Sequence, residues 1–368
     1  MSSVWGNKLK LSIFGESHGE GIGVVIDGLP AGIKLDLDYI NKEMQRRVPG
    51  KSKLATGRCE SDLYNILSGY FDGKTTGTPL CATILNKDKR SKDYSKFKTH
   101  MRPSHGDYTG FLKYSGFNDY RGGGHFSGRI TAPLVFAGAI AMQILEKHKK
   151  IFIGSHIKSI YTIEEEEFSL TDVTKEQLKN LRNSDFPVLC NEVGEKMKNE
   201  ILKAKHDGDS VGGVVECTAI NIEGGFGEPF FDSIESRLSH ILFSIPAVKG
   251  IEFGKGFNIS KLKGSNANDC YYINEGKILT KTNNNGGVLG GITNGMPLNF
   301  KVCIKPTPSI SKVQNTVDIS KMEQSQLVIE GRHDPCIVPR AIPVVESAVA
   351  ITILDFILER EGELWIKN

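Results

Sequence analysis

The sequence predicts an α+β protein, in which helices and mostly antiparallel strands form separate layers. Short strand-like runs lie close together along the chain, at spacings that suit antiparallel hairpins better than regular β-α-β units. Long apolar helical stretches interrupt these runs irregularly. Neither the Gly73-Lys74-Thr75 stretch nor residues 19–23 complete a phosphate-loop or dinucleotide-binding motif, so a Rossmann domain is disfavoured.

Composition indicates a globular chain. Its 368 residues are 39% hydrophobic and 24% charged, and no low-complexity linker divides them. About one domain per 150 residues would allow two or three domains, but we expect a single domain over residues 1–368. The formal net charge of +3 excludes a polycation, so any site for anions depends on local clustering.

The spacing of the cysteines and the hydropathy of the chain indicate the cellular compartment. The seven cysteines are widely spaced and form no C-x-x-C pair, which disfavours a disulfide framework and a structural zinc site. The longest apolar run, residues 132–145, is shorter than the about 20 residues that a bilayer span needs. No secretion signal is visible at the N-terminus. We therefore expect a cytoplasmic protein that requires no metal and no membrane.

The elements of the first half follow from periodicity and from the residues that end helices. Residues 9–14 and 23–27 are predicted strands on either side of a glycine-rich turn. Residues 36–47 have helical spacing and stop before Pro49, because the residue before a proline avoids the α region. Residues 127–150 are a predicted long helix that ends in a basic cluster, where the helix dipole favours cations.

The second half begins with a charge-dense stretch. Residues 161–207 are predicted to be a solvated outer element, since runs of charge usually face water. Residues 211–222 and 298–304 are predicted strands, and residues 234–243 a helix. Residues 344–360 are predicted to form a closing helix with a broad apolar face.

Residues 119–129 contain the clearest candidate site. Three consecutive glycines allow the backbone to approach a ligand closely, and the predicted helix beyond them presents N–H groups at its N-terminus. Arg121 and Arg129 add full charges, so the stretch predicts an anion site. The alternative is a flexible turn before a helix.

Two histidines lie in glycine-bounded loops. His18 follows Ser17, and His105 follows Ser104 close to Arg102. Imidazole titrates near about 6.5, and a phosphate partner raises that value, so either histidine suits general-acid work on an anionic substrate. Each could instead be a structural hydrogen-bonding residue. A nucleophilic Ser–His pair is disfavoured, because adjacent side chains rarely point at one another.

Two further loops carry reactive side chains. Residues 331–336 combine an anion-binding arginine, a histidine and Asp334, which could act as a base or form an Asx-turn before Pro335. Residues 305–309 offer a lysine and two hydroxyls that suit phosphate. Residues 87–102 hold seven Lys/Arg against two Asp and are a candidate lid over an active site.

Taken together, these motifs resemble the chorismate synthase family. The matching stretches are, in chain order, residues 15–19, 26–28, 102–105, 121–129 and 331–336 with Glu346-Ser347. The resemblance runs from about Trp5 to the last helix. It implies a β-α-β sandwich with long central helices between two antiparallel sheets, assembled as a homotetramer.

The resemblance also implies an activity. Members of the family are lyases that convert 5-enolpyruvylshikimate 3-phosphate to chorismate, the last step of the shikimate pathway in aromatic amino-acid biosynthesis. Phosphate and a ring proton leave in an anti-1,4 elimination. Reduced FMN is required although no net redox change occurs.

Three residues match the catalytic groups of that family. His105 matches the histidine assigned to protonating the reduced flavin, and His18 matches the one that protonates the departing phosphate. Asp334 matches the base that works with the flavin N5 to remove the ring proton.

Binding residues are carried over in the same way. The substrate has a phosphate and two carboxylates, and guanidinium forks suit such planar oxyanions. The matching substrate-binding arginines are Arg47, Arg102, Arg129 and Arg332. The matching flavin contacts are His125, Phe126, Ser127, Pro246, Ala247, Gly290, Lys305, Pro306, Thr307, Pro308, Ser309 and Arg332. Arg47 and Lys53 match positions linked with NADP.

Two other functions compete with this interpretation. The first is a bifunctional synthase that reduces its own FMN with NADPH. Because no separate nucleotide-binding domain is visible, we favour an enzyme that relies on an external flavin reductase, with NADPH only as an indirect reductant. The second is an RNA-binding module that uses residues 87–102. It is disfavoured because the charge is local and no RNA-binding signature occurs, so we expect no nucleic-acid partner.

Overall fold

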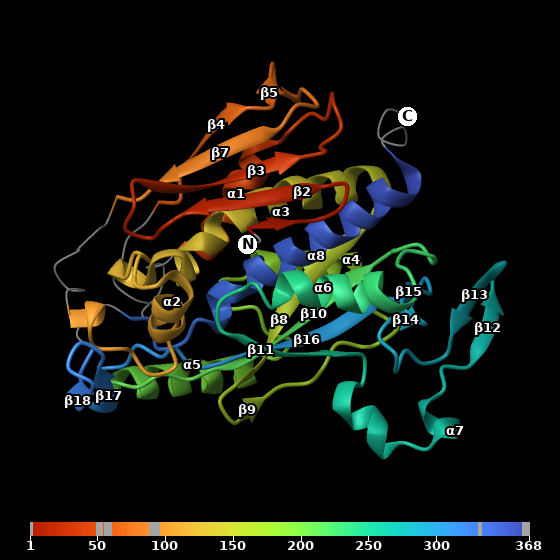
Figure 1. Cartoon of the computed structure of the whole chain (residues 1–368). Coiled ribbons are helices and arrows are strands. Elements are labelled where there is room, and N and C mark those ends of the chain that lie inside the picture. The colour runs from red at the N-terminus through yellow and green to blue at the C-terminus, as the bar shows by residue number, and fades with distance from the viewer. Residues whose placement is uncertain (1–2, 49–53, 55–60, 88–95, 330–332, 363–368) are drawn as a thin grey trace.

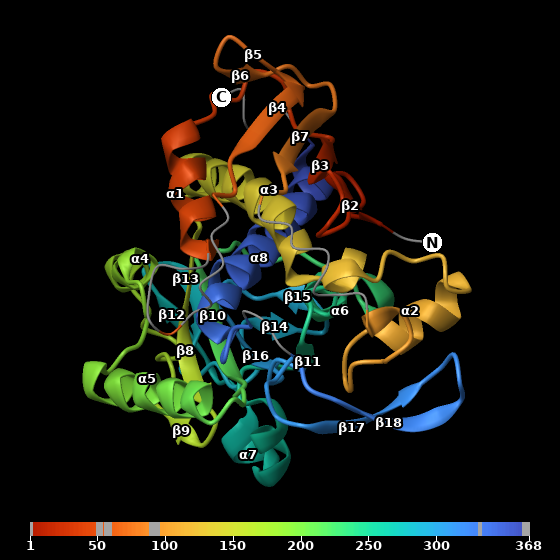
Figure 2. The ribbon, with the colours of Figure 1, turned by 90° about the vertical axis from the view of Figure 1, so that its left-hand side faces the viewer.

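Two five-stranded antiparallel sheets enclose a layer of helices (Figure 1). The computed structural model describes residues 3–48, 54, 61–87, 96–329 and 333–362. The first sheet has the strand order β1-β2-β3-β7-β4 and the second the order β11-β16-β10-β8-β9. The α+β class and the sandwich of helices between two sheets, both predicted from the sequence, are therefore confirmed (Figure 2).

The first sheet is formed by the N-terminal part of the chain. Its strands are β1 (Val4–Trp5), β2 (Lys10–Gly15), β3 (Gly21–Asp27), β7 (Leu80–Leu85) and β4 (Tyr64–Ser68). The predicted strands at residues 9–14 and 23–27 are β2 and β3, which pair from Lys10 with Asp27 to Gly15 with Ile22. The turn between them lies beside the candidate site.

The second sheet forms the opposite outer layer. Its strands are β11 (Val248–Phe253), β16 (Leu298–Ile304), β10 (Gly213–Ile220), β8 (Phe152–Ile160) and β9 (Ile163–Glu164). Three of them, β16, β10 and β8, are buried along most of their length. Helix α8 covers one face of β8 and β10, whereas α4 and α5 pack beside β8. The predicted strands at residues 211–222 and 298–304 are thus confirmed.

Eight α-helices occur in the described part of the chain. They are α1 (Leu37–Arg47), α2 (Asp107–Tyr114), α3 (Thr131–Ile144), α4 (Lys175–Asn183), α5 (Asn191–His206), α6 (Ile234–Leu242), α7 (Gly264–Ala267) and α8 (Val338–Glu361). Helix α1 begins where the Asp36 side chain accepts a hydrogen bond of 3.0 Å from the Tyr39 backbone N–H. Its last turn ends in Arg46 and Arg47, as predicted.

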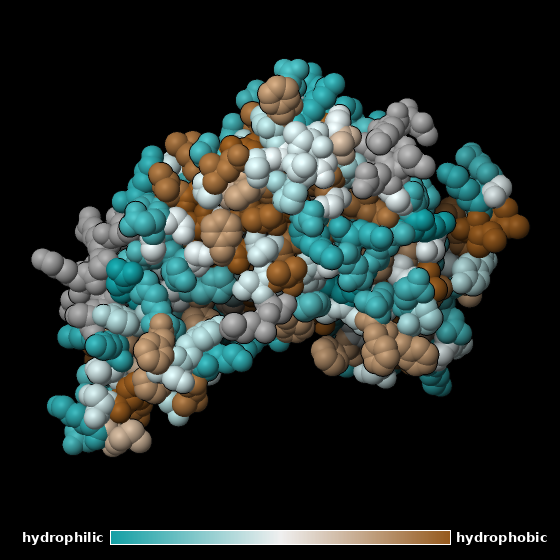
Figure 3. Space-filling view, turned by 45° about the horizontal axis from the view of Figure 1, so that its top comes forward, coloured by the Kyte–Doolittle hydropathy of each residue, from teal (hydrophilic) through white to brown (hydrophobic). Residues whose placement is uncertain are grey.

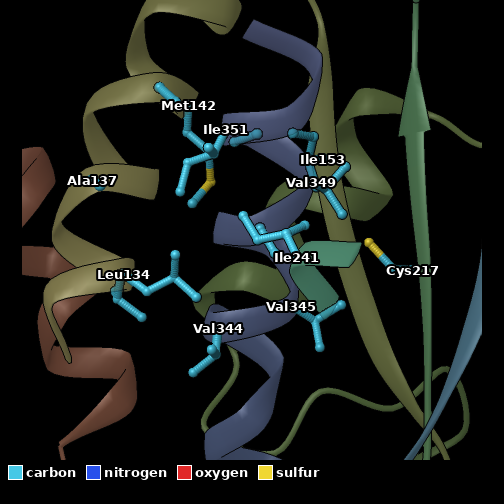
Figure 4. Packing of buried hydrophobic residues seen from close by; sticks show 14 of the residues in the cluster. Leu134, Ala137, Met142, Ile153, Cys217, Ile241, Val344, Val345, Val349 and Ile351 are labelled. Atoms are coloured by element: carbon cyan, nitrogen blue, oxygen red, sulfur yellow. The ribbon is translucent and has the colours of Figure 1, made fainter. Parts of the chain in front are cut away.

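Helices α3 and α8 form the centre of the molecule. Figure 4 shows Leu134 and Met142 of α3 facing Val344 and Ile351 of α8. The segments 128–149 and 338–361 are long and apolar enough to cross a bilayer, but 83% and 100% of their most apolar windows are buried inside the protein. A helix that is apolar all round belongs in a core, so the protein itself covers both segments.

Four short hairpins complete the described chain. They are β5–β6 (Tyr70–Phe71 and Lys74–Thr75), β12–β13 (Tyr271–Asn274 and Lys277–Thr280), β14–β15 (Val288–Leu289 and Ile292–Thr293) and β17–β18 (Gln314–Asp318 and Glu323–Leu327). The β12–β13 hairpin projects from the body, and Ile273 and Ile278 are 78% and 67% exposed on it. Figure 3 shows apolar residues at the same edge of the molecule.

Helix boundaries differ from the prediction in two places. The stretch predicted as one helix over 127–150 consists of the 3₁₀ turn Gly128–Ile130, helix α3 and the π-helical turn Leu145–Lys149. Helix α8 starts at Val338 and not at residue 344. A proline is tolerated in the first turn of a helix, because the N–H groups there have no partner within the helix, so Pro339 does not delay the start.

Most of residues 161–207 are exposed or half-buried, as predicted for a solvated outer element, but the prediction is wrong for two of its charged residues. Glu165 is buried and bonds to Nδ1 of His156, while Nε2 of His156 lies 2.7 Å from Glu216. Arg182 is buried against Glu43 and Glu146. Charge density in a sequence does not reveal such pairing, because the partners come from distant elements.

Candidate active site

A cavity of about 420 Å³ opens at one end of the central helices. It is lined by the end of α1, by the segments on either side of the glycine-rich stretch, by two loops after α6 and β16, and by the start of α8. The lining includes the predicted site residues Arg47, Arg102, His105, Phe126, Ser127, Arg129, Pro246, Ala247, Lys305, Thr307, Pro308, Ser309 and Asp334. Residues separated by almost the whole length of the chain therefore converge.

Four predicted residues lie outside that lining. Pro306 stands between two lining residues, and Gly290 forms the turn of the β14–β15 hairpin. The exposed His125 has its Nδ1 at 2.9 Å from the carbonyl oxygen of Gly15. His18 is buried directly behind the lining residue Gly122. Arg332 and Lys53 lie outside the described residues, as does part of the basic stretch 87–102.

The glycine-rich stretch brings His18 close to the cavity. Gly122, Gly123 and Gly124 all have positive φ, which side chains other than glycine rarely adopt. A Cβ atom at Gly122 would lie 2.1 Å from Cε1 of His18, so the absence of a side chain creates the space for the imidazole. His18 Nδ1 lies 3.1 Å from the Ser17 hydroxyl. Arg121 pairs with Asp119 at 2.8 Å and is not part of the lining.

His105, Arg102 and Asp107 form one cluster at the start of α2. Asp107 lies 2.7 Å from Nδ1 of His105 and accepts 2.7 Å and 2.8 Å hydrogen bonds from Arg102. Burial and the charges of Arg102 and Lys305 outweigh Asp107, so the pKa of His105 lies below its ordinary value. The imidazole is therefore neutral near pH 7 in the absence of an anionic ligand.

A second cluster joins α1 to the segment before α3. The buried carboxylate of Asp62 accepts a 2.9 Å hydrogen bond from Nε of Arg47 and also pairs with Arg129. Burial alone would raise the pKa of Asp62, but the two guanidinium groups hold it below its ordinary value. Sequence reasoning missed Asp62, because the residue belongs to no recognisable motif.

A third pair lies at the start of α8. Arg340 pairs with Asp334, and its Nε donates a 3.1 Å hydrogen bond to the carbonyl oxygen of Arg47. Arg340 and His333 also line the cavity. Helical spacing could have indicated Arg340, since it lies one turn before residue 344 on the same predicted face, but the predicted helix started too late.

Another part of the cavity wall is apolar. Ile245, Pro246, Ala247 and Val344 face the cavity, and Ala247 has a φ of +73°. Lys305 links this wall to the histidine loop, because its backbone N–H donates to Ala247 and its Nζ lies 2.5 Å from the Ser104 carbonyl oxygen. Burial and Lys249 lower the pKa of Lys305.

This arrangement suits a multiply charged anion with a flat apolar part. Five cationic side chains line the cavity, namely Arg47, Arg102, Arg129, Arg340 and Lys305. Among the described residues, no group of three or more His, Cys, Asp and Glu could hold a metal ion. Phe97 of the basic stretch is buried against Leu327 and Ile329, so its ring is not exposed for stacking on a base.

The sandwich fold holds a cationic cavity with the mixed polar and apolar lining that is typical of a small-molecule enzyme site. Residues 9–358 match the family model described as chorismate synthase. A chorismate synthase from Pyrococcus abyssi is 48% identical over 96% of this chain and 97% of its own length. One from Dehalococcoides mccartyi is 47% identical over 97% of each chain.

A solved structure agrees with these relatives. The crystal structure of a chorismate synthase superimposes with a TM-score of 0.74 at 30% identity, over 97% of this chain and 94% of that one. The chain belongs to the chorismate synthase family, and the resemblance noted in the sequence is confirmed.

Proposed function

We propose that this chain converts 5-enolpyruvylshikimate 3-phosphate to chorismate with the help of reduced FMN. It is a carbon–oxygen lyase that removes phosphate and a ring proton in an anti-1,4 elimination. The observation that carries the proposal is the convergence of four arginines, His105 and Asp334 on one cavity beside an apolar wall. Family membership supports the same reaction.

Binding of the substrate depends on fixed cations. The substrate carries a phosphate and two carboxylates. The proposed partners are Arg47, Arg102, Arg129 and Arg332, the last of which lies outside the described residues. A guanidinium group donates two parallel N–H bonds to an oxyanion, which orients the ligand as well as attracting it. Carboxylates behind three of these arginines hold the guanidinium groups in place before the ligand arrives.

His105 is the proposed proton donor. Its pKa lies below the ordinary value because of burial, Arg102 and Lys305. An anion bound in the cavity opposes those positive charges and raises the pKa of His105, so that the ring takes up a proton when the site is filled. Proton transfer by a positioned histidine contributes about 10²- to 10⁴-fold to a rate.

Asp334 and His18 are proposed to carry out the two remaining proton transfers. Asp334 is the proposed base for the ring proton. Its ion pair with Arg340 keeps the carboxyl group in the cavity, close to the first turn of α8. His18 is the proposed donor to the departing phosphate. It lies behind Gly122, so it acts through the opening that the glycine leaves.

The lining of the cavity supports the proposal that a flavin binds there. Its volume is within the about 300–1,000 Å³ typical of small-molecule sites, and it combines an apolar wall with cations and hydroxyls. Phe126, Ser127, Pro246, Ala247 and residues 305–309 would hold the cofactor. When bound, reduced FMN supplies electron density for the elimination.

The proposals on oligomeric state, compartment and source of electrons rest on membership of the chorismate synthase family. We expect a homotetramer of single-domain subunits in the cytoplasm, supplied with reduced flavin by a separate reductase and with NADPH as an indirect source of electrons. Arg47 and Lys53 are the positions linked with NADP. The burial of both long apolar helices agrees with a protein that does not enter a membrane.

An anaerobic assay tests the function. Photoreduced FMN and 5-enolpyruvylshikimate 3-phosphate are added to the protein, and phosphate release and chorismate absorbance are followed together. Equal amounts of phosphate and chorismate support the proposal. If neither product forms, the proposal is contradicted. Turnover with oxidised FMN and NADPH alone would show instead that the enzyme reduces its own flavin.

A further inference from the structure

One buried carboxylate serves two arginines of the cavity. Arg47 ends α1, whereas Arg129 belongs to the 3₁₀ turn before α3, so the backbone alone does not fix their relative positions. Asp62 accepts from Nε of Arg47 at 2.9 Å and from a second nitrogen of the same guanidinium. Its other oxygen pairs with Arg129, and its side chain is fully buried.

Further hydrogen bonds hold the two arginines in place, and together with Asp62 they form a frame around the guanidinium groups. Nε of Arg129 donates to Asn86 at 3.0 Å, and Arg47 lies 3.4 Å from the Thr131 hydroxyl. Asp62 itself has a φ of +48°, which a residue with a side chain adopts where its surroundings impose it. Within the described residues, Asp62 is the charged group that these two arginines share.

The negative charge of Asp62 opposes the attraction of the two arginines for anions. The guanidinium groups keep the carboxyl ionised near neutral pH, since they lower its pKa despite burial. Two guanidinium groups without this carboxylate would bind any small oxyanion strongly, because each offers a bidentate fork. The charges of Asp62 and these two guanidinium groups sum to one positive charge.

We propose that Asp62 is a positioning and specificity residue, which aligns Arg47 and Arg129 toward the cavity and weakens their hold on small anions such as free phosphate. Specificity often depends on an element that disfavours the wrong ligand. This inference rests on the proposed function, in which inorganic phosphate is a product that must leave while the larger substrate must stay.

Replacing Asp62 by asparagine tests both effects. Asp62→Asn keeps the shape and removes the charge. We expect inorganic phosphate, measured by calorimetry without flavin or substrate, to bind about three- to tenfold more tightly, because one opposing charge is gone. We expect kcat to fall at least about tenfold without a rise in KM, since misplaced groups reduce rates steeply.

A matched control removes an equivalent charge elsewhere. Glu195 is exposed on α5 and pairs with Lys198, so Glu195→Gln changes the net charge by the same amount and should alter neither property. Arg129→Lys adds a second comparison. Its effect on kcat should be smaller in the Asp62→Asn background than in the native chain, because the frame that orients Arg129 is already lost.

The outcomes separate this inference from the proposed function. Phosphate binding that is unchanged or weaker in folded Asp62→Asn overturns the role of Asp62, and so does an unchanged kcat. A merely structural role would weaken phosphate binding and lower thermal stability together. If native protein forms no chorismate but Asp62→Asn still binds phosphate more tightly, the proposed reaction fails, whereas the effect of Asp62 on the binding of small anions stands. If Asp62→Asn does not fold, Asp62→Ser, which retains an acceptor, gives the same two measurements.

Discussion

His105 and Asp334 face the cavity from distant parts of the chain, and each has a charged partner that fixes its position. Asp107 holds the imidazole at 2.7 Å, and Arg340 pairs with the carboxylate. His105 could be predicted from the sequence because it stands beside Arg102 in a glycine-bounded loop. Asp62 could not, because its importance comes from partners that only the folded chain supplies. Arg340 was missed because the predicted helix began at residue 344, after it.

Truncating either side chain should reduce turnover and leave the fold intact. His105→Ala and Asp334→Ala are each expected to lower kcat by about a hundredfold or more, the usual effect of losing a positioned acid or base. Stopped-flow measurement of chorismate formation gives the rates, and circular dichroism checks the fold. His240→Ala, at an exposed histidine of α6, is the control. A near-native rate in either variant removes that residue from the mechanism.

Helices α3 and α8 approach closely at Gly138 and Ser347. A Cβ atom at Gly138 would lie 2.1 Å from Cβ of Ser347, so the two backbones cannot keep this distance with any larger residue. The sequence predicted both helices from their apolar periodicity. It did not predict which residues touch, because contact between two helices depends on their crossing point.

An alanine at Gly138 should therefore destabilise the protein. We expect Gly138→Ala to lower the free energy of unfolding by about 1–3 kcal/mol, the usual result of overpacking a core. Urea denaturation followed by fluorescence measures the change. Gly264→Ala is the control, because a Cβ there has nothing within 4 Å. Adding Ser347→Gly should recover part of the loss, and no recovery would contradict the contact.

Strands β8 and β10 hold a buried ion cluster on the face away from α8. Although burial lowers the pKa of His156, Glu165 and Glu216 raise it above its ordinary value. The stabilisation from protonated His156 is thus fully present below the unfolded pKa of about 6.5 and is lost as pH rises through the folded pKa. Urea unfolding at several pH values should show that the advantage of the native chain over His156→Gln shrinks as pH increases. A constant difference would contradict this.

The molecule as a whole presents one feature that a monomer does not explain. A two-stranded hairpin is marginally stable in water, yet β12–β13 extends away from the body with Ile273, Ile278 and Tyr271 exposed. The apolar and aromatic residues on either side of the Glu275-Gly276 turn could have indicated the strands. They could not indicate that most side chains of the hairpin lie exposed in the part of the chain that the structure describes.

We expect this hairpin to contribute to contacts between subunits of the proposed homotetramer. Ile273→Lys combined with Ile278→Lys should shift the protein toward smaller assemblies in light scattering at micromolar concentration, because charged residues are costly in an apolar interface. Lys277→Glu on the same hairpin is a control for charge alone. An unchanged tetramer in the double variant would exclude the hairpin from the interface.

The position of α8 has a consequence for biosynthesis. This helix lies in the middle of the molecule, packed against α3 and against strands β8 and β10, yet it follows all three in the chain and is synthesised after them. The apolar surfaces of α3, β8 and β10 that α8 covers therefore stay exposed until α8 has been synthesised. Nascent chains in that state aggregate readily, so chaperone supply, more than intrinsic stability, should govern the yield of soluble enzyme.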